Sequence, residues 1–228
     1  MKTVGIIGGM GTVATIDLFN KIVLETNAKS DKEHLHILID NNAQIPDRTS
    51  FILGDGEDPT YELVKSAKNL EKIGADFLAI PCNTAHYFYD VIKENVNIEI
   101  INMIEETSKF IKSKNINKVG LLATSGTIKA KVYDNVFENY DIEIVKPNCY
   151  EQSIIMDFIY GIKQSEKSFN KEGVIEVINN LKEKNATNVI LGCTELPVGM
   201  SMLGIEGNFI DPTNILAKAC VKKAKQES

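Results

Sequence analysis

Short apolar runs rich in β-branched residues alternate along this chain with longer amphipathic stretches, and this alternation limits the possible folds most. The stretches 59–74 and 170–185 have helical spacing, whereas the apolar runs show no alternation between apolar and polar residues. Such strands are buried on both faces, as in parallel sheets covered by helices. The pattern predicts an α/β fold, with strands at 3–8, 35–40, 76–81, 98–101, 118–123, 142–145, 188–192 and 208–211.

The second half of the chain repeats features of the first half. The segment "LEKIGADFLAIPCNTA" from Leu70 aligns with "LKEKNATNVILGCTEL" from Leu181 at an offset of 111 residues, which matches Cys82 with Cys193. An earlier pair, "TVGIIGGMGT" and "KVGLLATSGT", aligns at an offset of 115 residues. Each half therefore reads as a strand, a turn and a helix, followed by a helix, a strand, a cysteine and a helix.

This repeat predicts the organisation of the whole chain. We expect two pseudosymmetric α/β lobes, each with a mostly parallel sheet flanked by helices, and an active site in the cleft between them. Residues 1–102 and 212–228 are expected to form the first lobe, with the final helix packing back on it. Residues 103–211 are expected to form the second lobe.

The composition argues against several classes of function. Of 228 residues, 43% are hydrophobic and 25% are charged, as in ordinary globular proteins, and the net charge of −6 gives no basic footprint for nucleic acid. No run reaches the roughly 18 apolar residues of a membrane span, and "MKTVGIIGGMGT" meets glycines too early for a secretory signal. The four cysteines lie far apart without a C-x-x-C pair. We therefore expect reduced thiols and a cytoplasmic protein.

Cys82 and Cys193 each follow an expected strand and precede an expected helix. Ligands of open α/β sheets bind beyond the carboxyl ends of the strands, where helix N–H groups favour a thiolate and can also bind a carboxylate. Taken alone, each cysteine fits a small buried hydrophobic residue. Their matching places in the repeat favour a shared chemical role, whereas Cys149 and Cys220 lack this context and are predicted to be structural.

Two cysteines on opposite sides of one cleft suit a particular reaction. A thiolate removes an acidic C–H proton from one face of a substrate, a thiol returns a proton to the other face, and the stereocentre inverts. The ordinary thiol pKa of about 8.5 lies close enough to neutrality for either state to be reached. The two thiols would titrate as a coupled pair. The cysteine pair therefore predicts inversion of a stereocentre by two bases.

The chain contains a single arginine among its 25 lysines and arginines, and this residue, Arg48, lies in the polar loop 41–58. A guanidinium binds a carboxylate or phosphate through two parallel hydrogen bonds, which a lysine cannot provide. Long ordered loops are often lids or binding loops. We predict that Arg48 binds such a group; a chance surface arginine is the alternative.

Four motifs surround these residues. "PCNTAH" contains Cys82, "GCTEL" contains Cys193, "GGMGT" follows the first strand, and "IPDRT" contains Arg48. In this order and spacing the chain resembles the aspartate/glutamate racemase family over nearly its whole length, and most of all the cofactor-independent aspartate racemases. Glutamate racemases of cell-wall synthesis usually have an aspartate–serine pair and a histidine where this chain has Gly8-Gly9 and Glu195.

The resemblance implies that an amino acid lies between two catalytic cysteines, Cys82 and Cys193, without pyridoxal phosphate or a metal, in a protein that is often a homodimer. It implies interconversion of L- and D-aspartate, or of the glutamate enantiomers, and since both positions are cysteine, reaction in both directions. A carboxylate of the substrate would meet Arg48, and the α-carboxylate would meet the residues after the cysteines. The implied substrate-binding residues are Met10, Arg48, Asn83, Thr84, Thr124, Thr127, Lys163, Thr194 and Glu195.

Three residues keep more than one interpretation. His86 lies four residues after Cys82, a spacing that can chelate a metal on one helix face. No other ligand set converges in the sequence, so we expect His86 to support the cysteine or to be a hydrogen-bonded helix residue. Glu195 is either a carboxylate at a helix start or a partner of the substrate ammonium, and Asp47 is expected to orient Arg48.

Two other functions stay open at this point. "GMGTVA" at 9–14 matches the G-x-G-x-x-A turn of NAD(P)-dependent oxidoreductases, and Asp40 ends the second strand where a ribose-binding acid could stand. Asp40 comes late for that role, and the hypothesis leaves the motif at Cys193 unexplained. The other function is that of a catalytically inactive amino-acid-binding protein derived from a racemase, which keeps Arg48 but does not exchange the substrate proton.

Overall fold

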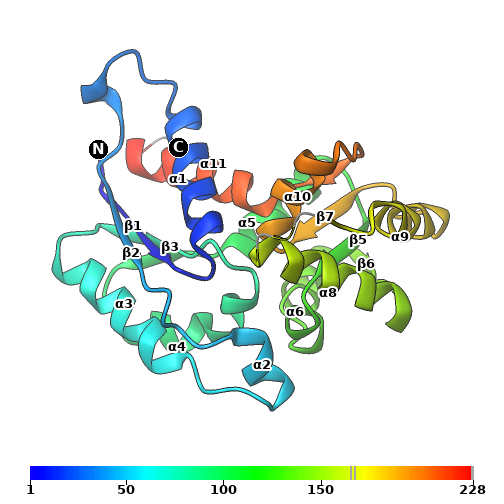
Figure 1. Ribbon diagram of the computed structural model, residues 1–228. Coiled ribbons are helices and arrows are strands. Elements are labelled where there is room, and N and C mark those ends of the chain that lie inside the picture. The colour runs from blue at the N-terminus through cyan, green and yellow to red at the C-terminus, as the bar shows by residue number, and fades with distance from the viewer. Residues whose placement is uncertain (165, 167, 227–228) are drawn as a thin grey trace.

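The computed structural model describes residues 1–164, 166 and 168–226, and in this part of the chain two separate parallel sheets form (Figure 1). Each of the eight runs expected from the sequence contains a strand. The strands are β1 (Val4–Gly8), β2 (Ile37–Asn41), β3 (Phe77–Ala79), β4 (Glu99–Ile101), β5 (Lys118–Ala123), β6 (Glu143–Val145), β7 (Val189–Gly192) and β8 (Phe209–Ile210).

The two sheets share one topology. The first sheet has the order β2-β1-β3-β4 and the second the order β6-β5-β7-β8, and every pairing is parallel. The first strand of each half thus lies inside its sheet, next to the strand that precedes a cysteine. The predicted fold class, two similar α/β lobes with parallel sheets, is confirmed.

Helices connect the strands and cover the sheets. They are α1 (Thr12–Thr26), α2 (Arg48–Leu53), α3 (Thr60–Lys72), α4 (Tyr89–Lys93), α5 (Met103–Ser113), α6 (Ser125–Lys129), α7 (Asp134–Phe137), α8 (Cys149–Lys163), α9 (Lys171–Glu183), α10 (Glu195–Leu203) and α11 (Pro212–Lys225). Short 3-10 helices lie at Asp31–Glu33, Thr84–Phe88 and Glu138–Tyr140. No helix in the described ranges has both the length and the apolar character to span a membrane.

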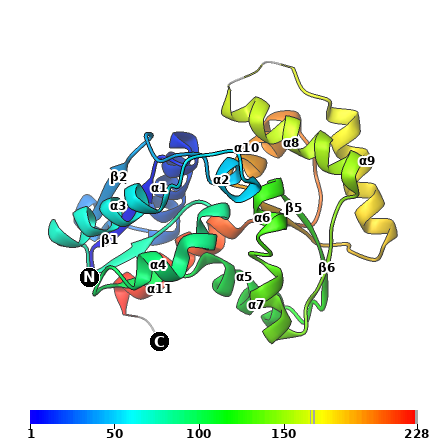
Figure 2. The ribbon, with the colours of Figure 1, turned by 90° about the horizontal axis from the view of Figure 1, so that it is seen from below.

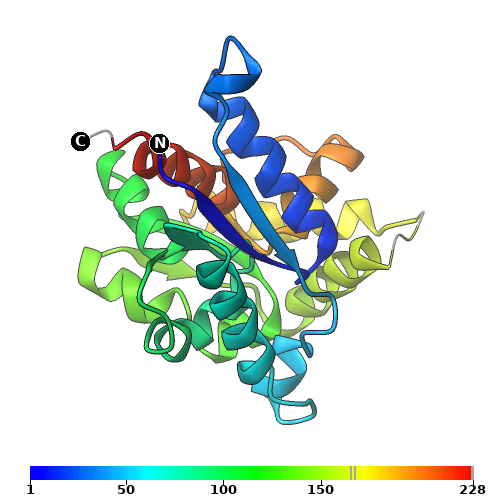
Figure 3. The same ribbon diagram turned by 90° about the vertical axis from the view of Figure 1, so that its left-hand side faces the viewer.

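Helices cover both faces of each sheet. Because successive side chains of a strand point to opposite faces, neighbouring residues of one strand pack in different cores. In β1, Ile6 packs in a core with α1 and α11, whereas Ile7 packs in a second core with α3 (Figure 3). In the second sheet, Leu122 faces a core built with α8, α9 and α10, and Leu121 faces a core with α5 and α7. This two-sided burial explains the uninterrupted apolar runs in the sequence.

The sequence repeat forms the same turn in both halves. Ala75 donates its N–H to the carbonyl of Leu70 between α3 and β3, and Ala186 donates to Leu181 between α9 and β7, at 3.0 and 3.1 Å. All four side chains are buried, and the leucines have no exposed surface. In each half, the matched leucine and alanine therefore form the turn before the strand that precedes a cysteine.

The last helix returns to the first sheet. α11 packs against α1 and α5, and the N–H of Lys2 donates to the carbonyl of Ala224 at 2.9 Å, so that the segment before β1 lies beside the end of α11 (Figure 1). The lobe bounds themselves, with a break after residue 102 and the return at residue 212, remain our proposal.

Candidate active site

The two repeated cysteines lie at one small cavity between the sheets. Cys82 follows β3 and Cys193 follows β7, and their exposed fractions are 5% and 6%. Both line a cavity whose other lining residues are Met10, Asp47, Arg48, Thr49, Asn83, Thr84, Thr124, Lys163, Thr194 and Glu195. The structure thus brings together eight of the nine substrate-binding residues expected from the resemblance. The other two cysteines lie elsewhere, Cys149 exposed at the start of α8 and Cys220 in the core of the first sheet.

The cavity is closed in this structure. Its volume is about 10 Å³, which leaves room for no more than about one water molecule. An amino acid is several times larger than this space. In this structure the residues on the two sides of the cavity therefore lie close to one another.

Cys193 has a carboxylate neighbour. Its thiol donates to Oε2 of Glu195 at 2.9 Å, and the hydroxyl of Thr194 donates to the same oxygen at 3.3 Å. Burial, together with the charge of Glu195, raises the pKa of the Cys193 thiol well above its ordinary value. Cys193 is therefore a neutral thiol in the closed site, and this is the state needed to donate a proton.

Lys163 brings a cation to the cavity from the end of α8. Its ammonium lies 5.0 Å from the centre of the Tyr160 ring. Burial by itself lowers its pKa, but the neighbouring Cys193, Glu195 and Cys82 reverse the direction and the net shift is upward. The ammonium thus stays charged and favours negative charge on the groups around it.

Arg48 supplies the second cation and is nearly fully buried, with an exposed fraction of 6%. Its guanidinium donates to the carbonyls of Pro46, Ile45 and Met10 at 2.9, 3.2 and 3.4 Å. Nε finds no partner within the described residues. Backbone carbonyls therefore hold the guanidinium in place, and Nε is an unpaired buried donor of a residue that lines the cavity.

The polar segment 41–58, expected to be a loop, contains helix α2. Asp47 caps this helix by accepting from the N–H of Ser50 at 2.8 Å. Burial is the largest single influence on the pKa of the Asp47 carboxylate and raises it. The hydrogen bonds from Ser50 and the charges of Lys163 and Arg48 together outweigh burial, so the net pKa is lowered. α2 crosses to the second sheet and packs on α6 (Figure 2). This crossing carries Arg48 to the cysteines.

Buried threonines join the two halves behind the cavity. The hydroxyl of Thr84 lies 3.0 Å from that of Thr124 and 2.9 Å from that of Thr127, and the hydroxyl of Thr49 donates to Thr124 at 3.2 Å. Thr127, which we also expect to line the pocket, lies within hydrogen-bond distance of Thr84 and Thr124 but is not among the residues that line the cavity. These hydrogen bonds link residues of the first half of the chain to residues of the second half.

His86 links the Cys82 turn to α5. One ring nitrogen, Nε2, accepts from the N–H of Met103 at 3.1 Å, so the other, Nδ1, carries the proton and donates to the carbonyl of Cys82 at 2.9 Å. Both ring nitrogens thus bond to backbone groups. This arrangement agrees with the expected role of His86 as a support for the Cys82 segment and leaves neither nitrogen free to bind a metal.

Tyr133 is a buried polar residue that the sequence did not point to. Its hydroxyl donates to Oδ1 of Asn83 at 2.5 Å, across the two halves of the chain. It lies in "KVYDN", outside every motif discussed above, and only the fold brings it to Asn83.

The glycine turn after β1 serves the chain itself. Gly9 has a φ of +93°, and a Cβ there would lie 2.3 Å from the backbone of Asn42. Its lack of a side chain is therefore used for a close approach of two chain segments, and the next residue, Met10, lines the cysteine cavity. The oxidoreductase hypothesis explained these glycines by a dinucleotide phosphate, and this packing gives them another reason.

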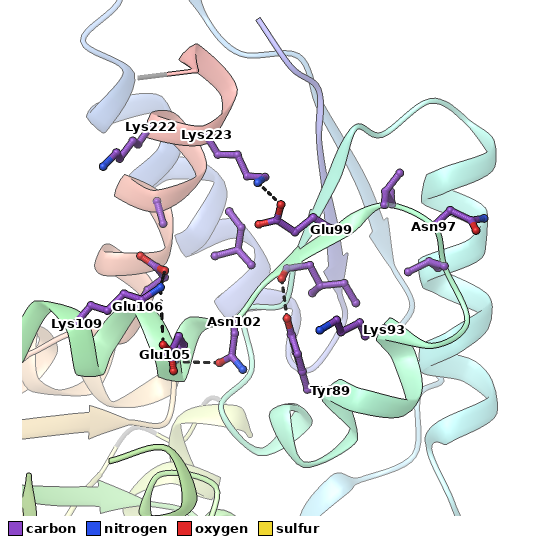
Figure 4. A pocket seen from close by; sticks show the side chains of 15 residues that line it. Tyr89, Lys93, Asn97, Glu99, Asn102, Glu105, Glu106, Lys109, Lys222 and Lys223 are labelled. Carbon is purple, nitrogen blue, oxygen red and sulfur yellow. Dashed lines mark hydrogen bonds and ion pairs between the residues drawn. The ribbon is translucent and has the colours of Figure 1, made fainter. Parts of the chain in front are cut away.

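A much larger hollow lies elsewhere, at the free edge of β4 (Figure 4). It is a groove of about 900 Å³ between α4, α5 and α11. Two ion pairs lie in it, Lys223 with Glu99 and Lys109 with Glu106, and the hydroxyl of Tyr89 donates to a strand carbonyl. No cysteine lines it. We therefore take the small cavity at Cys82 and Cys193, not the groove, as the candidate active site.

Comparison with known proteins identifies the family. The family model described as Asp/Glu/Hydantoin racemase matches residues 7–220. The chain belongs to this family. It is 27% identical to the broad specificity amino-acid racemase RacX of Bacillus subtilis over 222 residues, which is 96% of each chain. The predicted class of enzyme, an amino-acid racemase, is confirmed.

Solved structures of the family superpose closely. The aspartate racemase of Picrophilus torridus is 34% identical and matches with a TM-score of 0.88, over 99% of this chain and 95% of that one. An aspartate racemase homologue from Pyrococcus horikoshii is 27% identical and matches with a TM-score of 0.79, over 99% and 100%. The racemase therefore shares the whole two-lobed fold of these neighbours.

Proposed function

We propose that this racemase interconverts L- and D-aspartate by a two-base mechanism in which Cys82 and Cys193 are the acid and the base. The observation that carries the proposal is that both thiols line one cavity together with Arg48 and Lys163. Two cations beside two thiols suit a substrate with two carboxylates and an acidic Cα–H. The similarity to the aspartate racemase of Picrophilus torridus supports aspartate as the substrate.

The proposed reaction moves protons only. With Cys193 neutral, as its pKa indicates, the Cys82 thiolate takes the proton from Cα, and the C–H electron pair remains on a planar carbanion next to the carboxylate. Cys193 then donates its proton to the opposite face and becomes the thiolate. After one conversion Cys82 is the thiol and Cys193 is the thiolate, which is the state that reacts with the other enantiomer. No nicotinamide, pyridoxal phosphate or metal takes part in the proposed steps.

Charged groups around the thiols support this exchange. Lys163 stabilises whichever thiolate is present, because both cysteines influence its own pKa. We propose that Arg48 binds a carboxylate of aspartate and that Glu195 keeps Cys193 protonated in the resting enzyme.

We also propose that the enzyme is a cytoplasmic homodimer. Exposed apolar side chains on α1 and on the neighbouring edge strand β2 support a second copy as partner; they are Val13, Ile16, Phe19 and Ile39. Light scattering tests this part: the mass of two chains is expected, and the mass of one chain would contradict it.

Chiral analysis of amino-acid mixtures tests the proposed function. The enzyme should convert L-aspartate into D-aspartate without any added cofactor, and Cys82→Ser and Cys193→Ser should each abolish conversion, while Cys149→Ser, at an exposed cysteine far from the cavity, should not. Circular dichroism should show that all three variants fold. Near-normal activity in either of the first two variants would show that the two-base mechanism is wrong.

A substrate panel decides how narrow the activity is. Aspartate should react fastest, with glutamate next, since it differs by one methylene. Equal rates for many neutral amino acids would instead indicate a broad-specificity racemase, as the similarity to RacX suggests. Tight binding of aspartate without conversion would indicate an inactive binding protein.

A further inference from the structure

Tyr133 is a rigidly held phenol next to the cavity wall. It immediately precedes α7, has no exposed surface, and packs edge-to-face on Phe137 with ring centres 5.3 Å apart. Its hydroxyl donates to Oδ1 of Asn83 at 2.5 Å. Asn83 follows Cys82 directly and lines the cavity. The phenol thus touches the segment that carries a cysteine, but not the cavity itself.

The hydrogen bond determines which way the Asn83 amide faces. Burial raises the pKa of Tyr133 well above its ordinary value, so the phenol keeps its proton. If the amide were turned around, NH2 would donate to the phenol oxygen, and the phenol proton would be left buried without an acceptor, at a cost of roughly 1–3 kcal/mol. The orientation with Oδ1 toward Tyr133 is therefore the stable one, and Nδ2 faces away from the phenol.

Nδ2 of Asn83 is a donor without a partner. The side chain has an exposed fraction of 2%, and within the described residues its NH2 group makes no hydrogen bond. Nε of Arg48, another lining residue, is buried and without a partner in the same way. Buried donors are normally satisfied. Two such donors at one cavity indicate that an anionic acceptor belongs there.

On the basis of the function proposed above, we propose that Tyr133 is a positioning residue: its hydroxyl fixes the Asn83 amide so that Nδ2 donates to a carboxylate of the substrate. The residue acts through Asn83 and does not touch the substrate. Tyr133 and Asn83 belong to different halves of the chain. The hydrogen bond from Asn83 to the substrate carboxylate therefore forms only when the two halves pack together as in this structure.

A double-mutant cycle tests this role. The proteins compared are the wild type, Tyr133→Phe, Asn83→Ala and the combination of both, with Tyr89→Phe as the control, since its hydroxyl bonds to a strand carbonyl in the groove at β4. For each, calorimetry gives the Kd for aspartate and chiral analysis gives KM and kcat. Tyr133→Phe should weaken aspartate binding and raise KM about fivefold, as for the loss of one oriented hydrogen bond, while kcat changes less. Thermal unfolding should show that the variants fold.

The outcomes separate this role from a structural one. In the Asn83→Ala background, Tyr133→Phe should have no further effect on binding, and Tyr89→Phe should behave as the wild type. Equal weakening in both backgrounds, or unchanged binding in Tyr133→Phe, overturns the inference. Asn83→Asp should bind aspartate much more weakly, because the new carboxylate repels that of the ligand; wild-type binding by this variant also overturns it.

The proposed function and this inference can fail separately. If the wild type binds aspartate without racemising it, the proposed function fails, and the cycle on Kd still supports or overturns the role of Tyr133. If the wild type racemises aspartate but the cycle is additive, only the inference fails. If aspartate neither binds nor reacts, both are wrong.

Discussion

At the scale of single residues, the two cysteines have different surroundings. Cys193 donates to the carboxylate of Glu195, whereas Cys82 lies beside a histidine whose two nitrogens are turned to the backbone. Burial and the Glu195 charge both raise the pKa of Cys193. The pseudosymmetry of the backbone thus does not extend to the groups that set the protonation of the two thiols.

The Glu195 contact predicts the result of neutralising that carboxylate. Glu195→Gln removes a negative charge beside the thiol, so the pKa of Cys193 should fall, although burial keeps it above the ordinary value. The ultraviolet absorbance of the thiolate, titrated with pH and corrected with Cys193→Ser, measures this change. The exposed Glu206→Gln serves as the control. An unchanged or higher pKa in Glu195→Gln would contradict the proposed influence.

At the scale of elements, His86 ties the turn after β3 to the start of α5, and its burial makes stability depend on pH. Burial lowers the pKa of His86 from 6.5 to about 4. Between these values the unfolded chain binds a proton that the folded chain does not, so stability falls as the pH is lowered. From the size of the shift, the full loss is about 3 kcal/mol.

His86→Gln should therefore change the pH profile of unfolding. The variant loses hydrogen bonds and should be less stable at neutral pH, but its stability should fall less than that of the wild type between pH 6.5 and about 4. Urea unfolding at several pH values measures both effects, and the exposed His36→Gln is the control. Parallel pH profiles for His86→Gln and the wild type would show that His86 does not titrate in this way.

The contact of α2 with α6 gives a second prediction at this scale. A Cβ at Gly126 in α6 would lie 2.8 Å from the Cα of Thr49 in α2, so Gly126→Ala must push α2 and the adjacent Arg48 away. Overpacking of this kind costs about 1–3 kcal/mol. We expect a lower unfolding temperature and a higher KM for aspartate, whereas Glu183→Ala, at an exposed position of α9, should change neither. Wild-type KM in Gly126→Ala would mean that α2 does not position Arg48.

Local signals in the sequence were sufficient for the strands and the cysteines, but not for α2 or Tyr133. The strands are uninterrupted apolar runs, and the cysteines stand out because a buried leucine–alanine turn repeats before each. α2 has six residues and depends on the cap at Asp47 and on packing against α6. Tyr133 meets Asn83, 50 positions away in the chain, only after both halves fold.

At the scale of the whole molecule, two similar sheets enclose a cavity that is too small for a substrate. The walls come from both halves: α2 and the turn after β3 on one side, and the ends of β5, β7 and α8 on the other. Threonine hydroxyls, the Tyr133–Asn83 bond and the α2–α6 contact hold these walls together. In the proposed mechanism, aspartate held between these walls would have one thiol on each face of Cα.

The central claim is that the two thiols serve opposite faces of the substrate, and heavy water tests it most directly. L-aspartate is incubated with the enzyme in D2O, and Cα deuterium is measured early in the reaction, separately in L- and D-aspartate. Two bases predict deuterium in the newly formed D-aspartate while the remaining L-aspartate keeps its protium. Deuterium entering L-aspartate as fast as D-aspartate forms, or D-aspartate without Cα deuterium, would contradict the account.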